Sequence, residues 1–119
     1  MHYDELREYC LSLKGVTECF PFNETALVFK VQGKMFALLP LDNPDTQIAL
    51  KCDPEWAIQL RDEYEAITYA YHFSKKHWNS VHVHPAISRD FMLELIRHSY
   101  NLVVEGLPKK LKEELENKI

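Results

Sequence analysis

Hydrophobic residues at the start of the chain recur at intervals of three and four positions, the spacing of one face of a helix. The series is Tyr3, Leu6, Cys10 and Leu13. Gly15 follows it, and glycine tolerates the positive φ that commonly ends a helix. The pattern therefore predicts an opening helix that stops just before Gly15.

The next regular pattern is typical of strands. Residues 25–31 and 34–39 are mostly apolar, aromatic or β-branched, and the Gln32-Gly33 pair between them is a turn sequence. They predict a β-hairpin. After a turn rich in proline and asparagine, residues 47–51 predict a third strand, so that the three strands form an antiparallel meander.

The segment between the first helix and this hairpin, residues 16–24, is predicted as a connection. Within it, Phe20 and Phe22 flank the rigid Pro21. This arrangement suggests a loop that is held against the core by its two phenylalanine side chains.

A second helix is predicted to start at Asp53. Its carboxylate can accept hydrogen bonds from the free amide groups of a first turn, and Pro54 lacks a donor where none is needed. Further along, residues 71–73 and 81–83 alternate apolar side chains with histidine. They predict two more strands, joined near residues 75–79.

The last part of the chain predicts two helices. Ser88 is a capping residue in front of a helical series of apolar positions over residues 91–103, and Gly106 with Pro108 just beyond ends that helix. A short final helix is predicted from Lys109 onward.

The order of these elements is helix, three strands, helix, two strands and two helices. Strands with one apolar face need helices to cover it. The predicted class is therefore α+β, a five-stranded antiparallel sheet covered on one face by helices. The residues predicted to form its core are Leu6, Cys10, Leu27, Phe29, Phe36, Leu38, Leu60, Leu95 and Val103.

Composition and charge restrict the setting of this fold. A chain of 119 residues is long enough for one core, so residues 1–119 are predicted as a single domain. The net charge of -4 opposes indiscriminate phosphate binding. Three cysteines without a close pair, and no secretory or membrane-spanning pattern, predict a cytoplasmic protein in a reducing compartment. We expect a monomer without a cofactor.

One stretch of the chain differs from the acidic rest. Residues 68–84 contain four of the six histidines, two lysines and four aromatic residues, and no acidic residue occurs between Glu65 and Asp90. The local charge is therefore positive. Such a mixture fits a polyanion-binding surface and a buried turn equally well.

Five blocks of sequence, in the same order, resemble the MmcQ/YjbR family of small bacterial proteins. They are Phe-Pro-Phe at 20–22, Lys-Val-Gln-Gly-Lys-Met-Phe-Ala-Leu at 30–38, Lys-Cys-Asp-Pro-Glu at 51–55, Tyr-His-Phe-Ser-Lys-Lys-His-Trp-Asn-Ser-Val at 71–81, and His-Ser-Tyr-Asn-Leu-Val-Val-Glu-Gly-Leu-Pro-Lys-Lys at 98–110.

The resemblance covers nearly the whole chain. It implies a CyaY-like α+β fold, described in that family as a double-wing arrangement, and a DNA-binding role. Where the family usually has Lys-Arg-His-Trp-Asn, this chain has Lys-Lys-His-Trp-Asn at 75–79. The positive charge is kept, while the bidentate hydrogen bonding of arginine is lost.

The candidate nucleic-acid-binding residues lie in this stretch and near the end of the chain. Lysines at a wing tip would contact phosphates, an aromatic ring would stack on a base, and an asparagine would bind a base edge. The residues assigned to these roles are Lys75, Lys76, His77, Trp78, Asn79, Lys109 and Lys110. The C-terminal lysines alternate with glutamates, which also fits a solvated helix.

Two other functions compete with this hypothesis. A protein partner or a small ligand is the first alternative, and a closed pocket lined by Phe20, Tyr71 and Trp78 would favour a ligand. Histidine-based metal binding is the second, because His82 and His84 alternate onto one face of a predicted strand. His72 and His77 lie close to them in sequence, but no cysteine completes a familiar zinc spacing.

Catalysis is not expected. The chain has no phosphate-cradling glycine loop and no nucleophile elbow. Cys52, next to a predicted helix start, would have a lowered pKa if it were exposed, but a cysteine after an apolar strand more often belongs to the core. The sequence therefore predicts a non-enzymatic protein.

Overall fold

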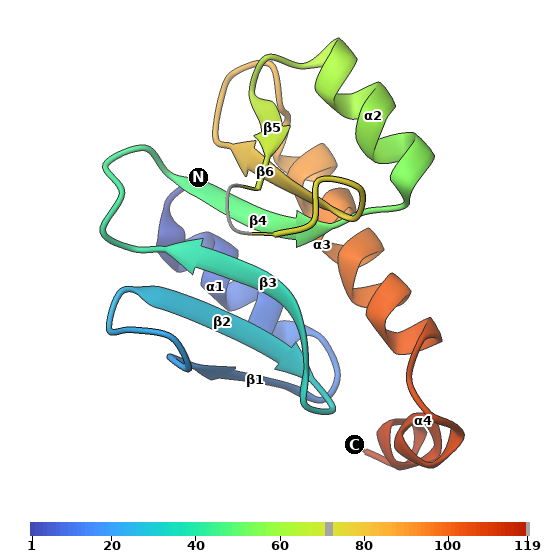
Figure 1. Ribbon diagram of the computed structural model, residues 1–119. Coiled ribbons are helices and arrows are strands. Elements are labelled where there is room, and N and C mark those ends of the chain that lie inside the picture. Colours follow the sequence, from blue (N-terminus) through green and yellow to red (C-terminus); the bar gives the residue numbers. More distant parts are fainter. Residues whose placement is uncertain (71–72, 119) are drawn as a thin grey trace.

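The computed structural model describes residues 1–70 and 73–118, which form four helices and six strands (Figure 1). The helices are α1 (Tyr3–Ser12), α2 (Pro54–Glu63), α3 (Arg89–Glu105) and α4 (Lys109–Glu116). The strands are β1 (Val16–Cys19), β2 (Ala26–Val31), β3 (Lys34–Pro40), β4 (Gln47–Lys51), β5 (Ile67–Tyr69) and β6 (Trp78–His82). The fold is α+β with an antiparallel sheet, as the sequence predicts.

The strands form one sheet in the order β1-β2-β3-β4-β6-β5. The hairpin between β2 and β3 turns at Gln32 and Gly33, whose φ values of 49° and 80° are typical of a two-residue hairpin turn. Gln32 also donates a hydrogen bond from Nε2 to the carbonyl of Leu111, at 3.1 Å. The same turn therefore anchors α4.

The sheet has one strand more than the five predicted. Residues 16–19, assigned to a connection, form β1 and pair with β2 at the edge of the sheet. Arg7 of α1 forms an ion pair with Glu18 of this strand, at 2.9 Å. The side chains of Phe20 and Phe22, which were expected to lie against the core, are 49% and 64% exposed. Residues 16–19 read Val-Thr-Glu-Cys, which does not alternate apolar with polar side chains, so the pattern of a half-buried strand is missing.

The last two strands begin earlier in the chain than predicted. β5 is residues 67–69, and the strand predicted at 71–73 includes Tyr71 and His72, which lie outside the described residues. β6 starts at Trp78, within the predicted turn, because all five of its residues pair with β4. Pairing with β4, which is distant in sequence, thus extends β6 to include the polar residues Asn79 and Ser80.

A β-bulge in β3 determines which of its side chains reach the core. Phe29 of β2 lies opposite Ala37, and the next residue of β2 lies opposite Met35, so Phe36 is left without a partner. An extra residue of this kind places two neighbours on one side and shifts the alternation of faces beyond it by one.

The bulge makes the core prediction for Leu38 wrong. Phe36 and Leu39 are fully buried in the core, while Leu38 is half-buried on the opposite face of the sheet. The other predicted core residues are confirmed: Leu6, Cys10, Leu27, Phe29, Phe36, Leu60, Leu95 and Val103.

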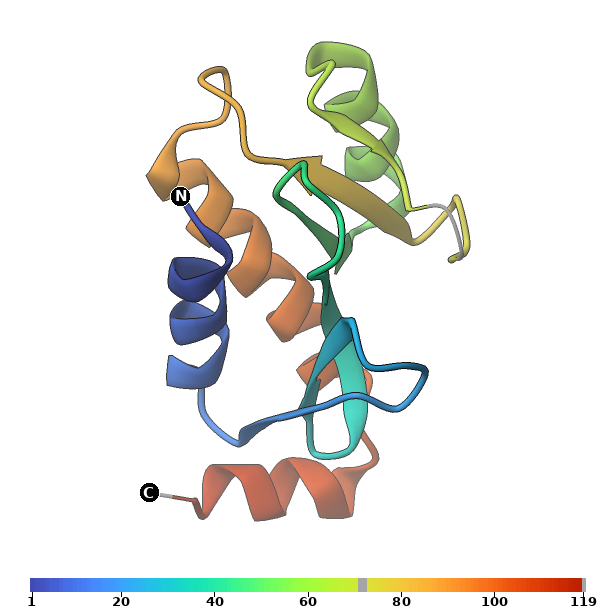
Figure 2. The same cartoon turned by 90° about the vertical axis from the view of Figure 1, so that its left-hand side faces the viewer.

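Helices α2 and α3 begin at the predicted capping residues. The Asp53 carboxylate accepts from the amide of Trp56 at 3.2 Å, and Ser88 Oγ accepts from the amide of Phe91 at 3.1 Å. α3 lies across β2, β3 and β4, α1 lies beside β1, and α2 contacts β5 and β6. Figure 2 shows α1 and α3 on the same side of the sheet and α4 across one end. In the described part of the chain, no helix has the length and apolar character needed to span a bilayer.

Ser99 connects α3 to the sheet at the bulge. Its side chain is fully buried, and its hydroxyl donates to the carbonyl of Phe36 at 2.6 Å. The same oxygen accepts from the amide of Lys51 at 2.9 Å. One serine thus supplies partners to a buried carbonyl of β3 and an amide of β4.

His98 is placed where its protonation opposes folding. Its Nε2 accepts a hydrogen bond from the Asp53 amide at 3.1 Å, and burial lowers the pKa of the imidazole despite the nearby carboxylates of Asp53, Glu105 and Glu94. Below about pH 6.5 the unfolded chain binds a proton that the folded protein resists, so stability falls as the pH falls.

We therefore expect the variant His98→Gln to lose less stability than the parent between about pH 7.5 and about pH 5.5. Chemical denaturation of both proteins at each pH measures this difference. The carboxylates and other histidines are common to both, so their contributions cancel. Equal losses in the two proteins would show that the His98 imidazole titrates alike in the folded and unfolded states.

Candidate functional site

Lys75, in the acid-free stretch, lies at the surface beside an exposed tyrosine. The Tyr69 side chain is 52% exposed, with the Arg61 guanidinium 4.5 Å and the Lys75 ammonium 5.0 Å from its ring centroid. Both distances are within the range of a cation–π interaction. Lys76 is also exposed. We call Arg61, Tyr69, Lys75 and Lys76 the basic tip.

Arg61 connects the basic tip to the buried side chain of Asn79. Its Nη1 donates to the carbonyl of Lys75 at 3.1 Å and to Asn79 Oδ1 at 2.6 Å. The Asn79 amide nitrogen in turn donates to the carbonyl of Ala57 at 3.4 Å. With 1% of its side chain exposed, Asn79 is part of the support of the tip. The side chain that was predicted to bind a base edge is thus engaged within the protein and is not presented at the surface.

The other candidate residues of this stretch are half-buried. The Trp78 ring stacks on Phe73, with 4.7 Å between the ring centroids and 23° between the planes. His77 accepts a hydrogen bond from the Cys52 amide through its backbone carbonyl, at 2.7 Å. His77 lies in the same turn as Lys75 and Lys76, whereas Trp78 is already the first residue of β6.

The C-terminal lysines lie elsewhere. Lys109 and Lys110 are exposed at the start of α4, and both views place α4 at one end of the molecule, well away from the turn that carries Lys75 and Lys76 (Figures 1 and 2). The two lysine pairs predicted to bind nucleic acid therefore do not form one continuous basic surface.

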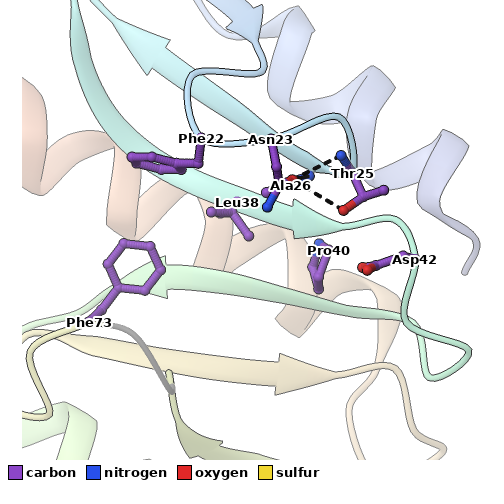
Figure 3. A pocket seen from close by; sticks show the side chains of 8 residues that line it. All are labelled: Phe22, Asn23, Thr25, Ala26, Leu38, Pro40, Asp42 and Phe73. Atoms are coloured by element: carbon purple, nitrogen blue, oxygen red, sulfur yellow. Dashed lines mark hydrogen bonds between the residues drawn. The ribbon is translucent and has the colours of Figure 1, made fainter.

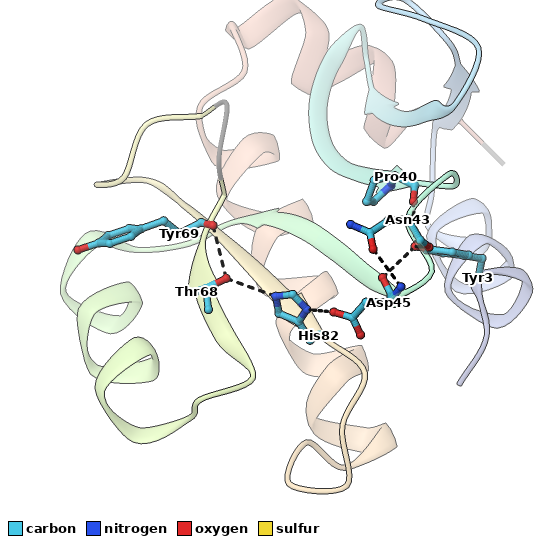
Figure 4. A network of polar contacts seen from close by, with 7 residues as sticks. All are labelled: Tyr3, Pro40, Asn43, Asp45, Thr68, Tyr69 and His82. Carbon is cyan, nitrogen blue, oxygen red and sulfur yellow. Dashed lines mark hydrogen bonds and ion pairs between the residues drawn. The ribbon is translucent and has the colours of Figure 1, made fainter.

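The histidines of the stretch do not converge. The His82 ring lies between Asp45, which pairs with Nδ1, and Thr68, whose Oγ1 is 3.4 Å from Nε2 (Figure 4). His84 Nδ1 accepts from the Ala86 amide at 2.9 Å. His72 lies outside the described residues. Among residues 1–70 and 73–118, no three His, Cys, Asp or Glu side chains are grouped to hold a metal ion.

The loop between β3 and β4 is held in place by two elements. The Tyr3 hydroxyl of α1 lies 2.9 Å from the carbonyl of Pro40 and 3.2 Å from that of Asn43 (Figure 4). Burial raises the pKa of this phenol. From the other side, His82 of β6 pairs with Asp45. These contacts fix the loop between β3 and β4 at the end of the sheet face that the helices leave uncovered.

A cleft of about 500 Å³ opens on the sheet face opposite α3. Phe22 extends into it from the loop before β2, and Phe73 from the segment before β6, with Leu38 of β3 between them (Figure 3). The remaining lining residues are Asn23, Thr25, Ala26, Pro40 and Asp42. Asp42 is the single charged side chain among the described lining residues.

A second hollow of about 220 Å³ shares Leu38, Pro40 and Phe73 with the first. The sheet beneath it is built from small residues, namely Ala49 of β4, Ser80 of β6 and the neighbouring Ala70. These side chains are buried, but their size leaves the space above them open. Because the two hollows share Leu38, Pro40 and Phe73, we call them together the sheet cleft.

Cys10 and Cys52 are buried and remain thiols in this arrangement. Burial raises the pKa of Cys52 to about 11 and that of Cys10 to about 12. The lowered pKa that an exposed Cys52 would have had is therefore absent. A thiol in this state behaves as a small apolar core residue.

Sequence reasoning missed several residues that now define the site. Arg61 lies on a helical pattern far from the acid-free stretch, and its approach to Tyr69 and Lys75 is a tertiary contact. A pocket lined by Phe20, Tyr71 and Trp78 was considered from the sequence, but Tyr71 lies outside the described residues. The aromatic side chains that line the sheet cleft are Phe22 and Phe73. The Phe-Pro-Phe sequence at residues 20–22 was the available signal.

A helix-backed antiparallel sheet with an open, cleft-bearing face defines a small α+β sheet domain. The chain belongs to the YjbR family, whose model matches residues 11–102. It is 37% identical over 108 residues to the protein YbdF of Escherichia coli O157:H7, covering 91% of this chain and 88% of that one. It is 26% identical over 110 residues to YjbR of Escherichia coli K12, covering 92% and 93% of the two chains.

Solved structures agree with this assignment. A crystal structure of Deinococcus radiodurans protein DR2400 superposes with a TM-score of 0.89 at 36% identity, covering 97% of this chain and 88% of that chain. A protein from Pseudomonas syringae has a TM-score of 0.72 at 23% identity, covering 86% and 98%. The second likeness is one of fold alone.

Proposed function

We propose that this protein is a non-enzymatic binding protein whose partner is single-stranded nucleic acid, contacted at the basic tip. The observation that carries the proposal is the position of Arg61 and Lys75 against the exposed ring of Tyr69. Positive side chains next to an accessible aromatic ring are the usual elements of a single-strand site.

Charge limits the strength of this interaction. The protein carries a net charge of -4, so most of its surface repels a polyanion and only the local tip attracts one. We therefore expect weak binding that falls steeply with added salt, since phosphate contacts release counterions.

The variant Lys75→Glu with Lys76→Glu is expected to abolish binding without unfolding the domain, because both side chains are exposed. The measurement is fluorescence anisotropy of labelled single- and double-stranded oligonucleotides at about 0.05 and 0.2 M salt. Lys109→Glu with Lys110→Glu is the matched control, because it makes the same change in charge on α4.

The control variant should bind as the parent does. If both double variants weaken binding equally, the net charge and not the basic tip determines affinity. Absence of binding by the parent at low salt would overturn the proposal.

The sheet cleft supports a second candidate, the binding of a small ligand or of a protein segment. Exposed Phe22 beside a depression of this size is an apolar feature that monomeric proteins commonly use for recognition. This function replaces the first if no oligonucleotide binds.

A further inference from the structure

We infer that the sheet cleft receives one unpaired base of the bound strand, a base that carries an exocyclic amino group. In this arrangement Phe22 and Phe73 contact the base, and the Asp42 carboxylate accepts a hydrogen bond from its amino group. The inference rests on the proposed function and names the part of the nucleic acid that this face recognises.

Two aromatic side chains line the cleft. Phe22 and Phe73 come from two different loops and lie on either side of Leu38 (Figure 3). Phe73 is already stacked on Trp78, so its ring is supported in place. The small side chains of Ala49 and Ser80 extend the space along the sheet. Aromatic rings on an open sheet are a common means of holding splayed bases.

The polar groups of the cleft determine which ring is preferred. Asn23 Oδ1 already accepts from the amides of Thr25 and Ala26, at 2.9 and 2.8 Å. Asp42 is exposed and carries the single negative charge among the described lining residues. A carboxylate accepts from the amino group of cytosine, whereas thymine offers no amino group. The cleft should therefore discriminate against thymine.

The basic tip lies next to the cleft along the chain. Phe73 is two residues from Lys75, and the turn between them and β6 is closed by a hydrogen bond from the Trp78 amide to the carbonyl of Ser74, at 3.0 Å. A strand whose phosphates contact Lys75 and Lys76 can therefore place a neighbouring base beside Phe73. In this arrangement Lys75 and Lys76 would supply the positive charge that the cleft itself lacks.

The experiment compares binding of labelled oligonucleotides of about ten deoxycytidines, deoxyadenosines or thymidines to the full chain. Phe22→Ala should weaken binding of the cytidine strand roughly tenfold, since one stacked base is lost. Phe20→Ala is the matched control, because Phe20 lies in the same loop and is 49% exposed. It should leave binding unchanged.

Asp42→Asn tests the chemistry of recognition. Removing a negative charge strengthens binding of every polyanion, so the readout is the ratio of affinities for cytidine and thymidine strands. The parent should prefer cytidine by at least about fivefold, and the variant should lose that preference. Glu24→Gln, which makes the same charge change at an exposed site in the neighbouring loop, should keep it.

The outcomes separate this inference from the proposed function. If Lys75→Glu with Lys76→Glu abolishes binding while Phe22→Ala binds as the parent does and Asp42→Asn keeps the parent's ratio of affinities, the basic tip binds phosphates and the base-binding role of the cleft is wrong. If the parent binds none of the strands, both are wrong.

Discussion

Leu39→Ala is expected to lower the free energy of unfolding by about 2 to 5 kcal/mol, the usual cost of truncating a large core side chain. Leu38→Ala, one position earlier, should cost clearly less. The reason is the bulge at Phe36, which turns Leu39 into the core and leaves Leu38 half-buried at the floor of the sheet cleft.

Denaturant unfolding followed by circular dichroism measures both values, and unchanged slopes would show that the comparison is valid. The two substitutions remove the same atoms from neighbouring residues of one strand. If Leu38→Ala proves the more destabilising, β3 alternates regularly and the description of the bulge is wrong.

Ser99→Ala is expected to be the second most damaging change, at roughly 2 to 4 kcal/mol, because two backbone groups lose their partner at once. The carbonyl of Phe36 and the amide of Lys51 both bind the Ser99 hydroxyl in the described structure. An alanine of nearly the same size adds no strain, so the loss reports the hydrogen bonds.

Ser80→Ala is the matched control for this measurement. Ser80 is 8% exposed and faces the sheet cleft, and none of the described hydrogen bonds involves its hydroxyl. It should shift the unfolding midpoint only slightly. A Ser99→Ala protein as stable as the Ser80→Ala protein would mean that water or a backbone shift satisfies both groups.

The helices and the central strands could be predicted from the sequence because their signals are local. Asp53 and Ser88 begin their helices as caps do, and the Gln32-Gly33 turn joins the expected hairpin. These features depend on residues within a few positions of one another. Family membership followed from blocks of sequence spread along the chain and is confirmed.

What sequence reasoning missed depends on contacts between distant residues. The edge strand β1 exists because β2 pairs with it. Similarly, β6 begins at Trp78 because this residue pairs with Lys51 of β4. The bulge at Phe36 is equally invisible, since both its neighbours are apolar and regular alternation fits them. Each case needs the partner strand before the pattern can be interpreted.

The candidate site depends more on tertiary contacts than the fold does. The exposure of Lys75 and Lys76 follows from their charge, whereas the burial of Asn79 and the contact of Arg61 with the tip have no local signal in the sequence. Arg61 reaches the surface cluster from α2, and Asn79 supports it from within. A single sequence holds no local signal for this contact between Arg61 and Asn79, because it depends on how α2 packs against β6.

The small residues under the sheet cleft can be replaced without changing the main core. Ala49 and Ser80 lie on the sheet face opposite the helices, and neither belongs to the main core. Enlarging either side chain would reshape the cleft while the helix-facing packing stays intact. Related proteins could therefore differ in the shape of this cleft through one or two substitutions at these positions, without any change to the rest of the fold.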